Sequence, residues 1–146
     1  MALDTSKPWL KNYPQGVPQE IGTLSHSSLT EFLDECFARF GKRKAVEAMG
    51  KFFSYRELDK LSHDFASYLQ TLNLEKGARV ALMYPNVIEY LVAMIGTLRA
   101  GYVVVNINPL YTARELEAQL LDSGAAVLVV MENFAHIYQE VNPIKT

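Results

Sequence analysis

The chain has 146 residues, of which 49% are apolar, which suits one globular domain or part of a larger one. Its 14 basic and 16 acidic residues give a net charge of −2 and form no long run of one sign, which argues against a nucleic-acid partner. Cys36 is the only cysteine, which excludes a disulfide framework within the chain, and no Cys/His metal spacing is present; we expect a reducing compartment and therefore a cytoplasmic protein.

Residues 1–25 lack the apolar run of a secretory signal peptide. They contain instead residues that disfavour a continuous helix or strand, namely Pro8, Pro14, Gly16, Pro18 and Gly22. We predict an extended arm over residues 1–25, followed by an incomplete α/β unit over residues 26–146. Because Trp9, Leu10 and Tyr13 are apolar, we expect the arm to lie against a surface.

Regular structure is predicted to begin at Ser28, because residues 28–31 have capping-box spacing, a hydroxyl three residues before a carboxylate. We expect the helix to end at Gly41. Its apolar residues recur at helical spacing: Leu29, Phe32, Leu33, Cys36, Phe37 and Phe40. Two short strands at residues 45–49 and 51–53, around Gly50, then predict a β-hairpin.

A second capping box at residues 54–57 begins the helix with the clearest apolar face in the chain. We predict that this face comprises Leu58, Leu61, Phe65, Tyr68, Leu69 and Leu72. The charged residues of the same segment fall on other faces, where they can stay hydrated.

The continuous apolar run at residues 80–84 predicts a strand that is buried on both faces of a parallel sheet, and residues 103–107 and 126–131 predict two further buried strands. Helices are expected between them. The first follows the turn at residues 85–86 and presents an inward face of Ile88, Leu91, Val92, Ile95 and Leu98. The second follows a third capping box at residues 112–115, reaches about Asp122 and stops at Gly124.

A last helix is predicted over residues 133–141, so the order is that of right-handed βαβ units. The apolar stretch Tyr90–Ile107 is interrupted by Gly96, Arg99 and Gly101. It therefore indicates a buried helix followed by a strand, and not a membrane span.

Ligands of α/β sheets bind at the carboxyl ends of the strands, here residues 84–86, 107–109 and 131–133. The sequence has no G-x-G-x-x-G, no G-x-x-x-x-G-K-[ST] and no G-x-S-x-G motif. We therefore assign no catalytic, cofactor-binding or metal-binding residue.

Polar residues at the strand ends have two interpretations, because they could line a crevice or satisfy local turn backbone, and the turn interpretation is favoured. These residues are Tyr84, Asn86, Asn106, Asn108 and Tyr111.

The remaining candidates have structural interpretations. His26, His63 and His136 are interpreted as surface or partly buried residues, and Cys36 as a small core residue. Glu115 fits a helix cap better than acid–base catalysis.

Two strings resemble core motifs of the adenylate-forming enzyme superfamily. Phe-Ser-Tyr-Arg-Glu-Leu at residues 53–58 is similar to the first motif, Leu-Thr/Ser-Tyr-x-Glu-Leu. Residues 98–109 are similar to the second, a Leu-Lys-Ala-Gly stretch that leads to a proline after a strand. Their order and spacing also match, as do residues 77–82 and 85–86 between them.

Further strings resemble bacterial long-chain fatty-acid–CoA ligases, at residues 9–14, 105–112, 114–116 and 133–136. The resemblance covers nearly the whole chain. It implies part of the N-terminal subdomain of that fold, a mostly parallel α/β sheet flanked by helices, with a short N-terminal hairpin.

The resemblance also implies a reaction. A fatty acid is activated by ATP with Mg²⁺ as an acyl-adenylate, and the acyl group is then transferred to coenzyme A. The superfamily's phosphate loop, which is rich in Ser, Thr and Gly and ends in Lys, has no counterpart up to Thr146. Nor have its ribose-binding Asp and catalytic Lys. We therefore expect an N-terminal fragment that is inactive alone and binds none of these cofactors.

A sheet cut within a domain exposes a strand edge, so we expect self-association through that edge or through exchange of the arm. The resemblance also implies peripheral contact with the inner face of a membrane, because long-chain fatty acids partition into membranes. The sequence shows no basic amphipathic helix for such contact. Two alternatives stay open: a standalone α/β binding or interaction module, and a superfamily member that activates a different carboxylic acid.

Overall fold

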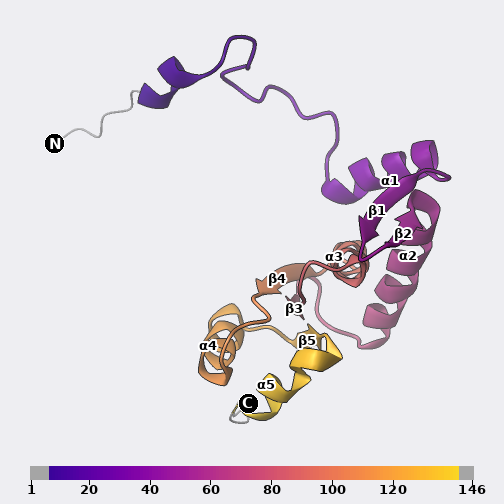
Figure 1. Cartoon of the computed structure of the whole chain (residues 1–146), viewed down its shortest axis with the longest axis vertical. Coiled ribbons are helices and arrows are strands. Elements are labelled where there is room, and N and C mark those ends of the chain that lie inside the picture. Colours follow the sequence, from indigo (N-terminus) through magenta and orange to yellow (C-terminus); the bar gives the residue numbers. More distant parts are fainter. Residues whose placement is uncertain (1–6, 142–146) are drawn as a thin grey trace.

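The computed structural model describes residues 7–141 of the chain (Figure 1). Residues 1–6 of the predicted arm and residues 142–146 of the predicted α/β unit lie outside the described residues. The first half of the chain forms η1 (Pro8–Asn12), α1 (Leu29–Phe40), β1 (Lys44–Ala48), β2 (Lys51–Ser54) and α2 (Tyr55–Thr71). The second half forms β3 (Arg79–Met83), α3 (Ile88–Arg99), β4 (Val103–Ile107), α4 (Ala113–Ser123), β5 (Val127–Val130), η2 (Glu132–Phe134) and α5 (Ala135–Gln139).

The predicted fold class is confirmed, because β3, β4 and β5 form a parallel sheet in the order β4-β3-β5 and helices flank it. The central strand β3 is buried on both faces. Ala81 and Met83 pack with residues of α4 on one face, and Val80 and Leu82 pack with residues of α2 and α3 on the other. This alternation follows from the two-residue period of a strand.

The prediction that all three strands are buried is wrong for most of β4 and for β5. Every residue of β5 is only half-buried, and in β4 Val103 is 48% exposed and Asn106 is also exposed. Within the described residues each of these strands has one neighbour, because β3 lies between them. An apolar run identifies a strand, but it does not say whether that strand is central.

The predicted hairpin is confirmed, with β1 and β2 antiparallel and paired from Ala48↔Lys51 outwards. Both central turn residues have positive φ, +51° at Met49 and +75° at Gly50, which suits the twist of a two-residue hairpin. A separate apolar cluster, around Phe37, Leu58 and Ile95, joins α1, α2 and α3 beside the hairpin.

The three helices α1, α2 and α4 begin at the predicted N-caps, and only the capping box of α1 differs from the prediction. Ser54 and Thr112 each form complete capping boxes with the glutamate three residues later. At α1 the Ser28 hydroxyl accepts from the Glu31 N–H at 3.1 Å, as expected. The Glu31 carboxylate, however, accepts from the backbone and hydroxyl of Ser27, one residue earlier, so the reciprocal half of that predicted box is wrong.

The buried face of α2 agrees with the predicted one at Leu58 and Leu69 but differs from it elsewhere. Tyr68 and Leu72 are 59% and 38% exposed, whereas Ser62 and Ala66 are buried. The cause is the close approach of α3, where a Cβ on Gly96 would lie 2.8 Å from the Ser62 carbonyl oxygen. The small residues Ser62 and Ala66 therefore share the buried face of α2 with Leu58 and Leu69.

The N-terminal arm extends away from the rest of the chain in Figure 1. It is irregular apart from η1, and Lys7 forms an ion pair with Glu20. Trp9 and Tyr13 are 54% and 41% exposed, so the expected packing of the arm against a surface is not found within residues 7–141.

Candidate functional site

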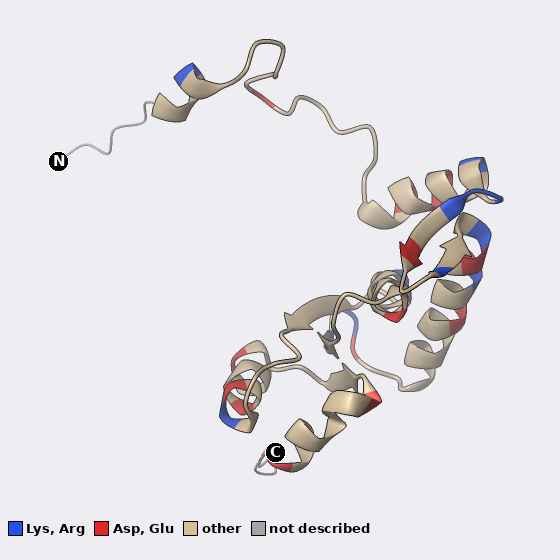
Figure 2. Cartoon of the chain, in the orientation of Figure 1, with Lys and Arg blue, Asp and Glu red and all other residues tan. Residues whose placement is uncertain are grey.

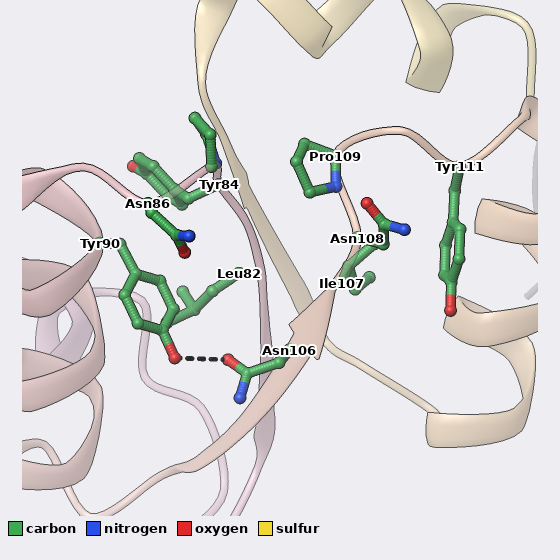
Figure 3. Close-up of a pocket in the computed structure, with 10 residues that line it drawn as sticks. Leu82, Tyr84, Asn86, Tyr90, Asn106, Ile107, Asn108, Pro109 and Tyr111 are labelled. Atoms are coloured by element: carbon green, nitrogen blue, oxygen red, sulfur yellow. Dashed lines mark hydrogen bonds between the residues drawn. The ribbon is translucent and has the colours of Figure 1, made fainter.

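A crevice of about 420 Å³ lies where β3 and β4 end (Figure 3). The two strands run in parallel register, with Met83 opposite Ile107, so the residues after them meet at one edge of the sheet. The crevice is lined by Leu82, Tyr84, Pro85, Asn86, Tyr90, Asn106, Ile107, Asn108, Pro109 and Tyr111. This is the edge at which α/β sheets bind ligands.

The loop after β4 is a turn held by Asn108. Its side-chain oxygen accepts from the Leu110 N–H at 3.0 Å, and its carbonyl accepts from the Tyr111 N–H at 3.1 Å. The turn interpretation is therefore confirmed for Asn108. In Figure 3, Tyr111 lies on the other side of the Asn108–Pro109 loop from Tyr90.

Asn106 has the other role, because it is the last exposed side chain of β4 and faces the crevice. The Tyr90 hydroxyl, from the first turn of α3, donates to the Asn106 side-chain oxygen at 2.9 Å. Figure 3 shows these two side chains pointing toward one another from different elements. This bond ties α3 to β4 and leaves the Asn106 amide nitrogen available for a ligand.

Tyr84 lies at the end of β3 on the same edge. Burial raises the pKa of its phenol above the ordinary value, and the negative charge of Glu89 adds to the shift. Tyr84 is therefore a neutral hydrogen-bonding group over the physiological range. Asn86 is exposed in the turn that leads to α3, which begins after Val87 without a side-chain cap.

The crevice lining consists of phenols, carboxamides, prolines and aliphatic side chains, without a charged side chain. Such a surface can hydrogen-bond neutral or planar polar groups and can pack against apolar ones. It lacks both the basic side chains and the glycine-rich backbone that hold phosphate groups. No candidate catalytic pair is assembled there.

The histidines occupy structural positions away from the crevice. His26 Nε2 lies 2.8 Å from a Glu35 carboxylate oxygen, and His63 contacts Asp59 and Arg99. His136 is exposed on α5. Within residues 7–141, no group of three His, Cys, Asp or Glu side chains is placed to hold a metal ion.

Cys36 is only half-buried on α1, so it is less enclosed than the core residue expected from the sequence, and Glu115 caps α4 as expected. Across the same part of the chain, no helix combines the length and apolar character that crossing a bilayer requires.

Sequence reasoning missed Arg99 as an organising residue. Its side chain is 7% exposed and its guanidinium bonds the Asp59 carboxylate at 2.7 Å and the Ser62 hydroxyl at 2.8 Å. It also pairs with Asp34 and lies over the Phe37 ring at 4.9 Å. The available signal was a lone cation in an apolar stretch, which usually indicates a specific partner.

The sequence matches the family of AMP-binding enzymes over residues 33–145. It is 50% identical to a long-chain-fatty-acid–CoA ligase of Yersinia pestis over 136 residues, which are 92% of this chain and 24% of that protein. A long-chain-fatty-acid–CoA ligase of Bacillus subtilis is 36% identical over 89% of this chain and 23% of its own length. The chain thus spans about a quarter of the length of these relatives.

Solved structures show the same fold. A benzoate CoA ligase from Burkholderia xenovorans superimposes with a TM-score of 0.73 at 24% identity, over 77% of this chain and 23% of that one. The N-terminal domain of FACL13 from Mycobacterium tuberculosis gives a TM-score of 0.70 at 28% identity, over 75% and 28% of the two chains. With the sequence match over most of its length, the chain belongs to the family of AMP-binding enzymes.

Proposed function

We propose that this chain forms the N-terminal part of an ATP-dependent long-chain fatty acid–CoA ligase. The observation that carries the proposal is 50% identity over 92% of the chain with a long-chain-fatty-acid–CoA ligase. In the proposed reaction the carboxylate attacks the α-phosphorus of ATP and releases pyrophosphate. The thiolate of coenzyme A then attacks the acyl-adenylate carbonyl and releases AMP.

The described residues fit a scaffold role in this reaction better than a catalytic one. ATP and Mg²⁺ are held by basic side chains and carboxylates around the phosphates, and the crevice lining contains no charged side chain. We therefore propose that residues outside this chain bind ATP, Mg²⁺ and coenzyme A. Residues 7–141 contribute the sheet and the uncharged crevice beside them.

An assay on the enzyme expressed from the intact reading frame tests the proposal. We expect ATP-dependent thioester formation with long-chain fatty acids, and AMP and pyrophosphate as products. The 146-residue chain alone should form no acyl-adenylate. A preference for an aryl or short-chain acid would refute the long-chain assignment, and a defined ligand bound by the isolated chain would favour a standalone binding module.

We also propose that the chain alone self-associates. β4 and β5 are the two edge strands of the sheet. The arm carries exposed apolar side chains such as Ile21 (88% exposed) and Leu24 (73% exposed). Exposed strand edges and apolar segments promote pairing between copies. Sedimentation that shows a monomer over a wide concentration range would contradict this proposal, and deletion of residues 1–25 separates the contribution of the arm from that of the edges.

The location that we propose is the cytoplasm, with peripheral contact on the inner face of the membrane. The support is chemical, because long-chain fatty acids concentrate in bilayers. Flotation of the intact enzyme with inner-membrane vesicles would test it, and recovery only in the soluble fraction would count against it.

A further inference from the structure

Basic side chains are concentrated around the hairpin although they are scattered in the sequence as a whole. Residues 39–56 contain six of the 14 Lys and Arg residues and one acidic residue, Glu47. Figure 2 shows blue segments at the end of α1, along the loop to β1 and at the start of α2. We name as the hairpin surface the exposed residues Arg39, Lys42, Arg43, Lys44, Met49, Lys51 and Phe52.

The hairpin surface also exposes two large apolar side chains. Met49 is 90% exposed at the turn, and Phe52 is 50% exposed on β2. Met49 has φ +51°, a conformation that favours Gly or Asn at this position of a hairpin turn. The turn therefore holds an apolar side chain in water at a backbone cost, and such strain is typical of contact sites.

Cations and aromatic rings lie side by side on the hairpin surface and at its border, where Phe40 is half-buried. Lys44 Nζ lies 4.5 Å from the centroid of the Phe52 ring, and the guanidinium groups of Arg39 and Arg43 lie 5.1 and 5.4 Å from that of Phe40. Lys44 also donates to Glu47 at 3.1 Å, which neutralises part of the charge.

The loop that carries these cations is anchored to α2. The Tyr55 and Arg56 N–H groups donate to the Arg43 and Gly41 carbonyls, both at 3.0 Å. The surface is therefore presented by a fixed backbone.

We propose that the hairpin surface binds the anionic headgroups of a lipid bilayer, with Met49 and Phe52 at the boundary of the acyl chains. This inference deepens the membrane contact proposed above and rests on it. Lys and Arg are attracted to the negative surface potential of anionic lipids, and apolar side chains gain from burial below the headgroups. A nucleic acid would satisfy the cations through its phosphates but would leave the Met49 side chain in water.

Vesicle co-sedimentation of the full 146-residue chain tests the inference. We expect binding to phosphatidylcholine vesicles that contain phosphatidylglycerol, little binding to pure phosphatidylcholine, and weaker binding as salt rises. Replacing Lys42, Arg43 and Lys44 with Gln should weaken binding at least about tenfold. The matched control replaces Lys60, Lys76 and Arg114 with Gln, which removes the same charge elsewhere and should change binding less than about twofold.

The substitution Met49→Asn tests the apolar contribution without risk to the fold, because Asn suits the positive φ of the turn. We expect a variant that is at least as stable and binds anionic vesicles roughly threefold to tenfold more weakly.

Three results would overturn the inference. The first is an equal loss of vesicle binding in the Lys42, Arg43 and Lys44 variant and in its control variant. The second is undiminished vesicle binding by Met49→Asn, and the third is binding to duplex DNA or RNA with none to vesicles. Thioester formation by the intact enzyme on a dispersed fatty acid is the separate readout. Thioester formation without vesicle binding refutes the membrane role of the hairpin surface and leaves the ligase proposal standing. Vesicle binding without thioester formation refutes the ligase proposal and leaves the hairpin surface standing.

Discussion

Gly96 shows how the absence of a side chain sets the distance between two helices. A Cβ at this position would lie 2.8 Å from Phe65 Cδ1 and 2.8 Å from the Ser62 carbonyl oxygen. The second of these is backbone and cannot move aside easily. Thr97, the next residue of α3, is fully buried and donates to the Ala93 carbonyl at 2.7 Å, so this contact leaves no buried polar group unpaired.

The substitution Gly96→Ala should therefore destabilise the chain by about 1–3 kcal/mol, although Ala is the better helix former. Urea denaturation followed by circular dichroism measures the change. Ser67→Ala, on the exposed face of α2, is the control and should stay within about 0.5 kcal/mol. A Gly96→Ala variant that gained stability would show that α2 and α3 can separate at little cost.

Tyr84, which lines the crevice, makes the stability of the chain depend on pH in the alkaline range. Its raised pKa means that the folded chain favours the neutral phenol, so the associated stability is present below about pH 10 and is lost as pH rises through the folded value. The difference in phenolate absorbance between the wild type and Tyr84→Phe should show a group that ionises above the ordinary value. Glu89→Gln should lower that pKa, and an unchanged titration would exclude the contribution of Glu89.

At the scale of elements, caps fix where helices begin. The Thr112 hydroxyl accepts from the Glu115 N–H and donates to the Glu115 carboxylate, while the Thr112 N–H donates to the same carboxylate at 2.8 Å. Thr112→Ala should cost about 1 kcal/mol in urea denaturation, whereas Thr112→Ser keeps the hydroxyl and should cost less than half as much. Equal losses would assign the effect to the methyl group.

Arg99 connects three helices, because it lies at the end of α3 and bonds residues of α1 and α2. Arg99→Lys keeps the charge but cannot bond Asp34, Asp59 and Ser62 together, so we expect a loss of about 2–3 kcal/mol. Amide hydrogen exchange should quicken in α1 more than in α4. Arg114→Lys, on the exposed face of α4, serves as the control, and uniform acceleration in both variants would argue against a specific role.

The elements that sequence identified are those with local determinants. The capping boxes at Ser54 and Thr112, the turn at Gly50 and the continuous apolar run of β3 each depend on residues close in sequence, and all are found. Apart from the Glu31 half of the first capping box, which is a local error, the errors concern distant contacts. The buried face of α2 depends on Gly96 of α3, and the exposure of β4 depends on which strands flank it.

The position of the crevice and most of its lining were predictable from the strand ends, but the contact between Tyr90 and Asn106 was not. The strand ends located the edge, and Asn108 was correctly interpreted as a turn residue. Tyr90 was missed, because it lies in the first turn of α3 and meets Asn106 only where α3 crosses over from β3 to β4. The alternation of residues along a strand gives no sign of such a partner.

The molecule as a whole should be sensitive to acid. Hydrogen bonds from the N-terminal turns lower the pKa of three glutamates: the Ser27 side chain acts on Glu31, and the backbone N–H groups of Ser54 and Thr112 act on Glu57 and Glu115. A carboxylate with a lowered folded pKa contributes stability above its unfolded value, and this is lost as pH falls.

We therefore expect the urea midpoint to fall between about pH 5 and about pH 3. Replacing Glu31, Glu57 and Glu115 together with Gln should flatten that dependence, because the amides do not titrate. A variant with the same slope as the wild type would place the acid sensitivity elsewhere.

The strand order β4-β3-β5 also has a consequence for biosynthesis. Val80 of β3 pairs with Val127 of β5, which the ribosome adds 47 residues later. At a synthesis rate of about 5–20 residues per second, the edge of β3 that pairs with β5 stays unpaired for roughly 2–10 s, although β4 can already pair with the other edge. One side of the apolar strand β3 is therefore unpaired in the nascent chain during this interval, and a chaperone that shields apolar segments should bind most strongly between the emergence of β4 and that of β5.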